Sequence, residues 1–231
     1  MHRAIEIQNI EYAWSGAQKF SLHIENLGID VGETVLLSGA SGAGKSTLLN
    51  LICGIIQPNQ GAITVGGVDI TRLKGAKRDR FRADHMGIIF QMFNLLPYAS
   101  PLDNILLPLK FAPARAKSVK DPRAEALRLT KALGLDGQLV TGQKAAELSI
   151  GQQQRVAAAR ALIGKPALVI ADEPTSALDG NSQKAFIEVL REQVSSIGST
   201  LLMVSHDLQL AKYFNRRIDL EDLTQCAGEL A

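Results

Sequence analysis

Residues 34–55 read TVLLSGASGAGKSTLLNLICGI, and this stretch decides the fold. Its first part, TVLLSG, is short and continuously apolar, as expected of a parallel strand buried on both faces of a sheet. Its last part, STLLNLICGI, is typical of an apolar helix. Between them, GASGAGKST matches the phosphate-binding pattern GxxxxGK[ST], which requires a strand before it and a helix after it. The competing interpretation, a glycine-rich turn with a chance lysine, is disfavoured by these flanking elements.

The loop at residues 39–47 is therefore predicted to bind the phosphates of a nucleoside triphosphate. Its glycines let the backbone curl so that N–H groups point at phosphate oxygens, and the following helix adds the positive end of its dipole. We expect Lys45 to reach the β and γ phosphates and the Ser46 hydroxyl to bind Mg²⁺. The predicted nucleotide-binding residues of the loop are Gly39, Ala40, Ser41, Gly42, Ala43, Gly44, Lys45, Ser46 and Thr47.

Two further segments share the short, apolar character of TVLLSG and also end in polar residues. They are ALVIADEP at residues 167–174 and TLLMVSHD at residues 200–207. Helical stretches alternate with these strands, which favours an α/β fold with a covered, mainly parallel core sheet. The first 35 residues differ, because they contain short alternating runs such as IEIQNI between turns, and they predict an antiparallel β region.

The segment from Gln91 to about Pro166 has helical patterns and no obvious core strand, so we expect a helical insertion. The single domain then divides into a catalytic core with the β region, residues 1–90 and 166–231, and a helical subdomain, residues 91–165. Within the helical part, FAPARAKSVKDPRAE at residues 111–125 has prolines towards both ends. This segment is predicted to be a surface loop that leads into a helix.

Acidic residues follow the strand in ALVIADEP. Because parallel neighbours present their carboxyl ends to the same crevice, we expect Asp172 to lie near the Mg²⁺ that Ser46 binds. Glu173 would orient or deprotonate the attacking water. The alternative is an acidic pair that caps a turn before Pro174. His206 follows another apolar strand, and we predict that it donates to the γ phosphate or the water, although a lone histidine is more often structural.

Composition and charge limit the classes of partner. The formal net charge is +2, from 25 basic and 23 acidic residues, which gives no overall case for binding nucleic acid. The basic run at residues 71–84, TRLKGAKRDRFRAD, is interleaved with aspartates and is interpreted as a solvated helix face. Cys53 and Cys226 lie far apart without CxxC spacing, so neither a zinc site nor a disulfide framework is expected, and a reducing cytoplasm fits best.

The N-terminal residues, MHRAIEIQNI, lack the apolar stretch and the cleavage site of a signal peptide. The longest nearly apolar runs, such as LLNLICGII, are well short of the roughly 20 residues that a membrane-spanning helix needs. If the protein acts at a membrane, we expect another chain to span it.

The segment LSIGQQQRVAAARAL begins at Leu148 and lies between the phosphate loop and the acidic strand. Ser149 is a good helix N-cap and Gln152 completes a capping-box pattern, so the helix tip should offer N–H groups to an anion. In this order, GASGAGKST, LSIGQ, LVIADEPT and the later histidine resemble the ATP-binding cassette family, the ATPase subunits of ABC transporters, over essentially the whole chain. The resemblance implies a P-loop NTPase with a RecA-like core that hydrolyses ATP with Mg²⁺.

In that family the LSGGQ-type signature closes over nucleotide held by the phosphate loop of a second subunit. The resemblance therefore implies a homodimer in which Ser149, Gly151 and Gln152 contact nucleotide in trans. The first signature glycine is replaced here by Ile150. A β-branched residue does not readily take positive φ, so we expect this position to be extended or helical, and its effect on turnover stays open.

Other family elements match at single positions. Gln91, in IIFQ, resembles the Q-loop glutamine, which implies a part in Mg²⁺ binding and catalysis. SALD at residues 176–179 resembles the D-loop that joins the two subunits, with Asp179 at its acidic end and near nucleotide. Trp14 occupies the place where the family usually has an aromatic residue that stacks on adenine, and Tyr12 is the alternative.

The segment after Gln91 reads MFNLLPYASPLDNILLPLK. Part of it is expected to pack in the helical subdomain, and an exposed apolar docking site is predicted at Met92, Phe93, Leu95 and Leu96. In the resemblance this is where the permease's coupling helix binds. FQxFNLLP with NILLPL is similar to the lipoprotein-releasing and macrolide-exporter subgroup. The chain is thus expected to be cytoplasmic, peripheral on the inner face of the membrane through a permease, and to serve export or mechanotransmission.

Three other functions stay open at this point. A soluble cassette ATPase of macromolecular assembly, such as iron–sulfur assembly, would have no membrane partner. A GTPase switch would carry an NKxD base-recognition motif, which the sequence lacks. A module that binds ATP without hydrolysing it would not need Glu173 and His206, and both are present. The transported substrate is not determined by the sequence.

Overall fold

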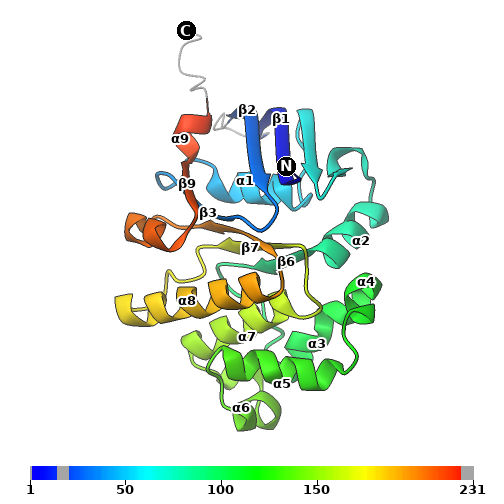
Figure 1. Cartoon of the computed structure of the whole chain (residues 1–231), viewed down its shortest axis with the longest axis vertical. Helices are drawn as coiled ribbons and strands as arrows, with labels where there is room; N and C mark the ends of the chain where they lie inside the picture. The colour runs from blue at the N-terminus through cyan, green and yellow to red at the C-terminus, as the bar shows by residue number, and fades with distance from the viewer. Residues whose placement is uncertain (1, 15–20, 225–231) are drawn as a thin grey trace.

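The structure is a computed structural model, and it describes residues 2–14 and 21–224. An antiparallel sheet lies at one end, a parallel sheet crosses the middle, and most of the helices gather at the other end (Figure 1). Cys226 lies outside the described residues. Cys53 is buried just after the helix that follows the phosphate loop, and burial raises the pKa of its thiol to about 12.

The antiparallel sheet has the strand order β2-β1-β4-β5. Its strands are β1 (Arg3–Ala13), β2 (Ser21–Asp30), β4 (Gln60–Val65) and β5 (Val68–Asp69). In β1 the buried isoleucines are Ile5, Ile7 and Ile10, so the alternation slips by one residue before Ile10. Asn9 has φ 47 there, and the register with β4 shifts between Gln8 and Glu11. A β-bulge at Asn9 thus keeps all three isoleucines on the core face.

The second sheet has the strand order β6-β7-β8-β3-β9, and each pair of neighbours is parallel. Its strands are β3 (Thr34–Ser38), β6 (Met86–Ile89), β7 (Leu168–Asp172), β8 (Thr200–Val204) and β9 (Arg216–Asp219). The predicted α/β fold with a mainly parallel core sheet and an antiparallel β region is therefore confirmed.

Each central strand of the parallel sheet contributes to two hydrophobic clusters. In β3, Val35 and Leu37 belong to the cluster that includes the antiparallel sheet and the helix after the phosphate loop, whereas Leu36 belongs to the cluster under the other helices. In β7, Ile170 and Ala171 divide in the same way. Because successive strand residues point to opposite faces, a continuous apolar run is what a sheet covered on both sides requires.

The helices lie mainly in the second half of the chain. They are α1 (Lys45–Ile52), α2 (Ala76–His85), α3 (Pro101–Phe111), α4 (Pro113–Lys117), α5 (Pro122–Ala132), α6 (Gly137–Gly142), α7 (Ile150–Leu162), α8 (Gly180–Ser196) and α9 (Leu220–Leu223). Short 3₁₀ segments are η1 (Ile70–Arg72), η2 (Ala145–Glu147) and η3 (Leu208–Tyr213). Helices α3 to α7 all fall within residues 91–165, and the division of the domain at these limits stays a prediction.

Two helical segments test the local predictions. Helix α2 has no buried residue among those described, which confirms the solvated face predicted for the basic run. The surface loop predicted at residues 111–125 is wrong for residues 111–117, because α3 extends to Phe111 and α4 follows at Pro113–Lys117, whereas the helix into which it leads is present as α5. Pro113 occupies the first turn of α4, where its missing N–H costs no hydrogen bond. Arg115 is buried, and its guanidinium is satisfied there because it donates to carbonyl oxygens of Met86 and Ile163.

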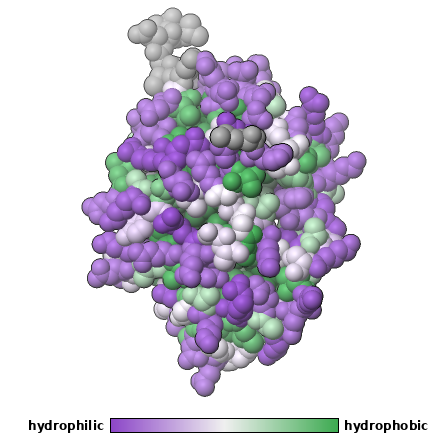
Figure 2. Space-filling view, viewed as in Figure 1, coloured by the Kyte–Doolittle hydropathy of each residue, from purple (hydrophilic) through white to green (hydrophobic). Residues whose placement is uncertain are grey.

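One face of the molecule is mostly polar. Figure 2 shows hydrophilic side chains over most of the visible face, with hydrophobic ones in small separate areas. Within residues 2–14 and 21–224, the structure contains no helix with the length and apolar character needed to span a membrane.

Candidate active site

The phosphate loop joins β3 to α1 at the carboxyl edge of the parallel sheet. Gly42 and Gly44 have φ values of 81 and 106, which side chains with a Cβ rarely adopt, so glycine is needed for this curl. Lys45 is the first residue of α1 and is 7% exposed. Its ammonium donates to the carbonyl oxygens of Gly39 and Ala40, each at 2.8 Å, so the loop wraps around the lysine head.

Asp172, at the end of β7, lies directly against Ser46. The Ser46 hydroxyl donates to Asp172 Oδ1 at 3.3 Å, which joins the phosphate loop to the acidic strand as predicted from their positions in a parallel sheet. Burial raises the pKa of the Asp172 carboxyl above its ordinary value, and the hydrogen bond from Ser46 opposes that rise. A hydroxyl and a carboxylate are hard oxygen donors of the kind that Mg²⁺ prefers, so these residues fit the predicted ion.

Glu173 has an unusual backbone conformation. Its φ is 42, in the left-handed region that disfavours residues with a Cβ, and its N–H donates to Val204 O of β8 at 3.1 Å. One carboxylate oxygen lies 3.1 Å from His206 Nδ1. The sheet therefore holds Glu173 in a strained position in which it meets His206, and such strain is characteristic of functional residues.

One cavity of about 440 Å³ brings together residues from separate parts of the chain. It is lined by Trp14, Ser41, Gly42, Gly44, Lys45, Ser46, Thr47, Gln91 and Glu173. Trp14 is 49% exposed, and the ring of Tyr12 lies nearly perpendicular to its indole with ring centroids 5.5 Å apart. Of the two aromatic residues, Trp14 is the one that lines the cavity.

A second cavity, of about 520 Å³, shares Glu173 with the first. His206, Ser176 and Leu178 lie on it, so it connects the end of β8 with the SALD segment. His206 does not line the first cavity as described, and it reaches the Lys45 side of the site through its contact with Glu173.

The predicted signature segment forms a capped helix start. Ser149 Oγ accepts from Gln152 N at 3.3 Å, and the Gln152 side chain accepts from Ser149 N at 2.9 Å, so the predicted capping-box pattern is present. Ile150 is the first residue of α7 and is 55% exposed, so of the two predicted conformations, extended or helical, the helical one is found. Neither Ser149 nor Gly151 is among the described residues that line the cavity of Lys45.

Asp179 also lies outside the lining of that cavity in the described part of the chain. It is the N-cap of α8, where its Oδ1 accepts from Asn181 N at 3.1 Å and Ser182 N at 3.0 Å. These hydrogen bonds hold the pKa of the Asp179 carboxyl below its ordinary value, and the bond from Ser182 has the largest effect. Its predicted nucleotide contact stays a prediction.

The apolar segment after Gln91 is only partly exposed. Met92 is 82% exposed, and Leu95 and Leu96 are half-buried. Phe93 is 8% exposed and packs in the hydrophobic core, so its predicted place in an exposed patch is wrong. Tyr98, which the sequence analysis did not single out, is 72% exposed. An aromatic residue between Pro97 and Ala99 in a loop was the available signal.

Comparison with known proteins identifies the family of this chain. The ABC transporter family matches residues 22–176. MJ0796 of Methanocaldococcus jannaschii, named an uncharacterized ABC transporter ATP-binding protein, is 36% identical over 220 residues, 94% of this chain and 93% of that protein. The lipoprotein-releasing system ATP-binding protein LolD of Syntrophotalea carbinolica is 38% identical over 222 residues, 94% of this chain and 95% of that protein.

The macrolide export ATP-binding/permease protein MacB of Burkholderia pseudomallei is 40% identical over 197 residues, which are 85% of this chain. The match spans only 29% of the length of that relative. Among solved structures, the dimeric post-hydrolysis state of the cassette MJ0796 bound to ADP and Pi has a TM-score of 0.80 and 31% identity, and 93% of each chain is covered.

Proposed function

This chain belongs to the ABC transporter family, and from this premise we propose that it is an ATP-hydrolysing subunit in which two copies close on ATP and drive a separate membrane permease. The observation that carries the proposal is the cavity in which the phosphate loop, Gln91, Glu173 and Trp14 meet. A soluble assembly ATPase is not favoured, because relatives that match along their whole length are named transporter or lipoprotein-release ATP-binding proteins.

Binding of ATP follows from the lining of this cavity. The indole of Trp14 stacks on adenine, the N–H groups of residues 39–47 bind the phosphates, and the Lys45 ammonium exchanges its carbonyl partners for phosphate oxygens. Ser46, Asp172 and Gln91 would hold Mg²⁺. When bound, this ion supplies charge stabilisation to the transferring phosphoryl group.

Hydrolysis then depends on the pair formed by Glu173 and His206. The Glu173 carboxylate orients the attacking water and takes its proton, since it lines the cavity beside the phosphate loop. His206 fixes that carboxylate through the 3.1 Å contact and donates towards the γ phosphate. The left-handed backbone of Glu173 keeps its side chain at the edge between the two cavities, where both partners are within reach.

The dimer supplies the groups that one copy lacks at its own phosphate loop. The tip of α7 offers backbone N–H groups and the positive end of the helix dipole at Ser149 and Gly151, and these would contact the γ phosphate held by the second copy. Asp179 and the rest of SALD would lie at the contact between the copies. The solved MJ0796 relative is itself described as a dimer bound to ADP and Pi, which supports this arrangement.

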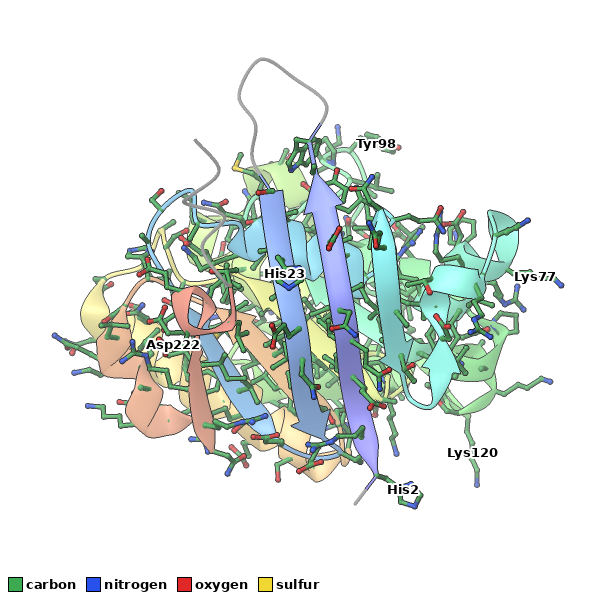
Figure 3. The ribbon with its side chains drawn as sticks, turned by 90° about the horizontal axis from the view of Figure 1, so that it is seen from above. His2, His23, Lys77, Tyr98, Lys120 and Asp222 are labelled. Carbon is green, nitrogen blue, oxygen red and sulfur yellow. The ribbon has the colours of Figure 1, made fainter. Side chains whose placement is uncertain are left out.

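The permease would dock on the segment after Gln91. Met92 and Tyr98 are its most exposed large apolar side chains, and Figure 3 shows Tyr98 at the periphery of the molecule. Docking here places the chain as a peripheral subunit on the inner face of the membrane. The relatives named LolD and MacB support export or mechanotransmission as the work performed.

The test is capture of the permease from the native host. Tagged Glu173→Gln protein, purified from detergent-solubilised membranes with ATP, is expected to retain a polytopic membrane protein identified by mass spectrometry. Adding Lys45→Ala to the same chain should abolish this capture because ATP binding is lost, and adding Met92→Glu should abolish it while ATP binding remains. Recovery of soluble partners alone, from a variant that still binds ATP, would contradict the proposal in favour of an assembly ATPase.

A further inference from the structure

The backbone of the loop that carries Gln91 has a conformation that is uncommon for residues other than glycine. Phe93 and Asn94 have φ values of 58 and 48, so two consecutive residues other than glycine lie in the left-handed region. The side chain of Phe93 disfavours this conformation, which asparagine adopts more readily, and a strained residue such as Phe93 persists only where the surroundings impose it. Something outside the loop must therefore fix residues 91–96, which we call the Gln91 loop.

Arg160 fixes the two strained residues. It lies near the end of α7 and is 8% exposed. Its Nη1 donates to Asn94 O at 2.6 Å, and its Nη2 donates to Phe93 O. The planar guanidinium thus binds two successive carbonyl groups at once, a fork geometry that lysine cannot reproduce.

Asn104 of α3 fixes the end of the same loop. It is fully buried, its Oδ1 accepts from Leu96 N at 2.7 Å, and its Nδ2 donates to Leu96 O at 3.1 Å. The Gln91 loop is therefore held from two helices by buried side chains that bind its backbone, in addition to the packing of Phe93 in the hydrophobic core. This leaves the Gln91 side chain itself exposed at the cavity of Lys45.

Helix α7 connects this clamp with the signature tip. Ser149 caps its start and Arg160 lies eleven residues later, about 16 Å along a helix that rises 1.5 Å per residue. The far end of α7 is fixed too, since Arg115 donates to Ile163 O at 2.9 Å and to Ala161 O at 2.8 Å. A rigid helix thus carries the Gln91 loop at one end and the signature tip at the other.

We propose that Arg160 is a positioning residue that locks the Gln91 loop to α7, so that the placement of Gln91 in the nucleotide cavity and the placement of the signature tip change together. This inference rests on the proposed function, because it assigns Gln91 and the tip to the same hydrolysis reaction. In this proposal, Arg160 contacts neither ATP nor Mg²⁺. Its loss should spare nucleotide binding and affect turnover and the response to Mg²⁺.

The experiment compares Arg160→Met and Arg160→Lys with a matched control, Arg155→Met. Arg155 lies on the same helix and also donates to a backbone carbonyl, that of Leu133, which is outside the Gln91 loop. Nucleotide binding is followed by the fluorescence of Trp14, the single tryptophan of the chain, which lines the cavity. Hydrolysis is followed as kcat, as KM for ATP, and as the Mg²⁺ concentration that gives half-maximal rate.

For Arg160→Met we expect binding of ATP within about twofold of wild type, a kcat lower by about tenfold to a hundredfold, and a several-fold higher Mg²⁺ requirement. Arg160→Lys should recover part of the kcat, because one carbonyl can still be bound. Arg155→Met should keep the wild-type Mg²⁺ requirement even where its thermal stability falls.

Three results would overturn the inference. One is a folded Arg160→Met with wild-type kcat and Mg²⁺ requirement; another is an equal change in the Mg²⁺ requirement for Arg155→Met. If Arg160→Met does not fold, a folded Arg160→Lys with unaltered Mg²⁺ requirement would also overturn it. A wild-type chain that binds ATP but has no hydrolysis, alone or with its permease, would instead remove the proposed function on which the inference rests.

Discussion

The cavity beside Lys45 and the tip of α7 are both proposed to bind phosphate through helix N-terminal N–H groups, but they are fixed in different ways. The first is built on the buried strands β3 and β7, whose main chains are hydrogen-bonded on both sides within the parallel sheet. The second is an exposed helix start whose position depends on side chains such as Arg160 and Arg115. One copy of the chain therefore preforms one half of the proposed site, whereas the other half lies on an exposed helix start that no sheet supports.

The largest expected effect is on the chemical step in the cavity beside Lys45. Glu173→Gln should lower the hydrolysis rate by about a hundredfold to ten-thousandfold, the usual contribution of a general base. Nucleotide binding should persist, since the phosphate loop is intact. Steady-state phosphate release and Trp14 fluorescence measure the two quantities. Hydrolysis at a tenth of the wild-type rate or more would assign the base to another residue.

The next largest effect concerns the tip of α7 and leaves the cavity beside Lys45 unchanged. Gly151→Asp places a carboxylate in the first turn of α7, where it suits the helix dipole of the isolated chain but repels phosphate held by a second copy. A Cβ at Gly151 has room, with only a Leu178 methyl within 4 Å, at 3.8 Å. We expect unchanged or higher thermal stability and a rate lower by about a hundredfold.

Gly151→Ala is the matched control for that change, and it should keep most of the activity. Sedimentation in the Glu173→Gln background shows whether ATP still produces a dimer. An ATP-dependent dimer of unaltered affinity in Gly151→Asp protein would mean that the tip of α7 does not face the nucleotide.

A smaller effect concerns the stability of the nucleotide-free protein. Burial raises the pKa of Asp172 above its ordinary value of 3.8, so the folded state holds this proton more tightly than the unfolded chain. As pH rises from 3.8 through the raised value, the group therefore lowers the free energy of unfolding. Asp172→Asn should remove this loss and raise the melting temperature at neutral pH, while Mg²⁺-dependent hydrolysis disappears.

Asp219 serves as a control, because its pKa shift and the resulting effect on stability have the opposite sign. Its pKa is lowered, chiefly by the hydrogen bond from Arg217, so its ionised form stabilises the fold above the ordinary pKa. Asp219→Asn should accordingly lower the melting temperature at neutral pH, and this difference should fade only as pH falls below 3.8, through the lowered pKa of the folded state. Melting curves from about pH 2 to 8 measure both variants, and a decrease with Asp172→Asn at neutral pH would contradict the assignment.

The smallest effect sharpens the description of the α7 tip. Ser149→Ala removes the oxygen that accepts from Gln152 N and should cost about 1 kcal/mol of stability. For a chain of this length the melting temperature would fall by about 2–4 °C. Ser149→Asn should retain the cap. Equal stability of the alanine variant and wild type would show that the exposed tip adds little to the fold.

Local sequence patterns predicted several parts of this molecule correctly. GASGAGKST lies between a buried strand and a helix, Ser149 and Gln152 form the capping box, and α2 has a solvated face with no fully buried residue. Each of these depends on the period of apolar residues, on glycine, or on a cap within a few positions. The predictions were wrong where contacts between residues far apart in the sequence determine the structure. Phe93 packs in the hydrophobic core, and the buried Arg115 donates to carbonyl groups far along the chain.

By itself, the sequence determined the α/β fold, the phosphate loop and the order of the motifs, because strand burial on two faces and the left-handed turns of glycine are local requirements. Only the tertiary structure decided that Glu173 is held in a left-handed conformation beside His206, and that Arg160 binds the backbone of the Gln91 loop. These contacts join residues that the chain separates widely. Packing of whole strands and helices brings them together, and no local pattern contains that information.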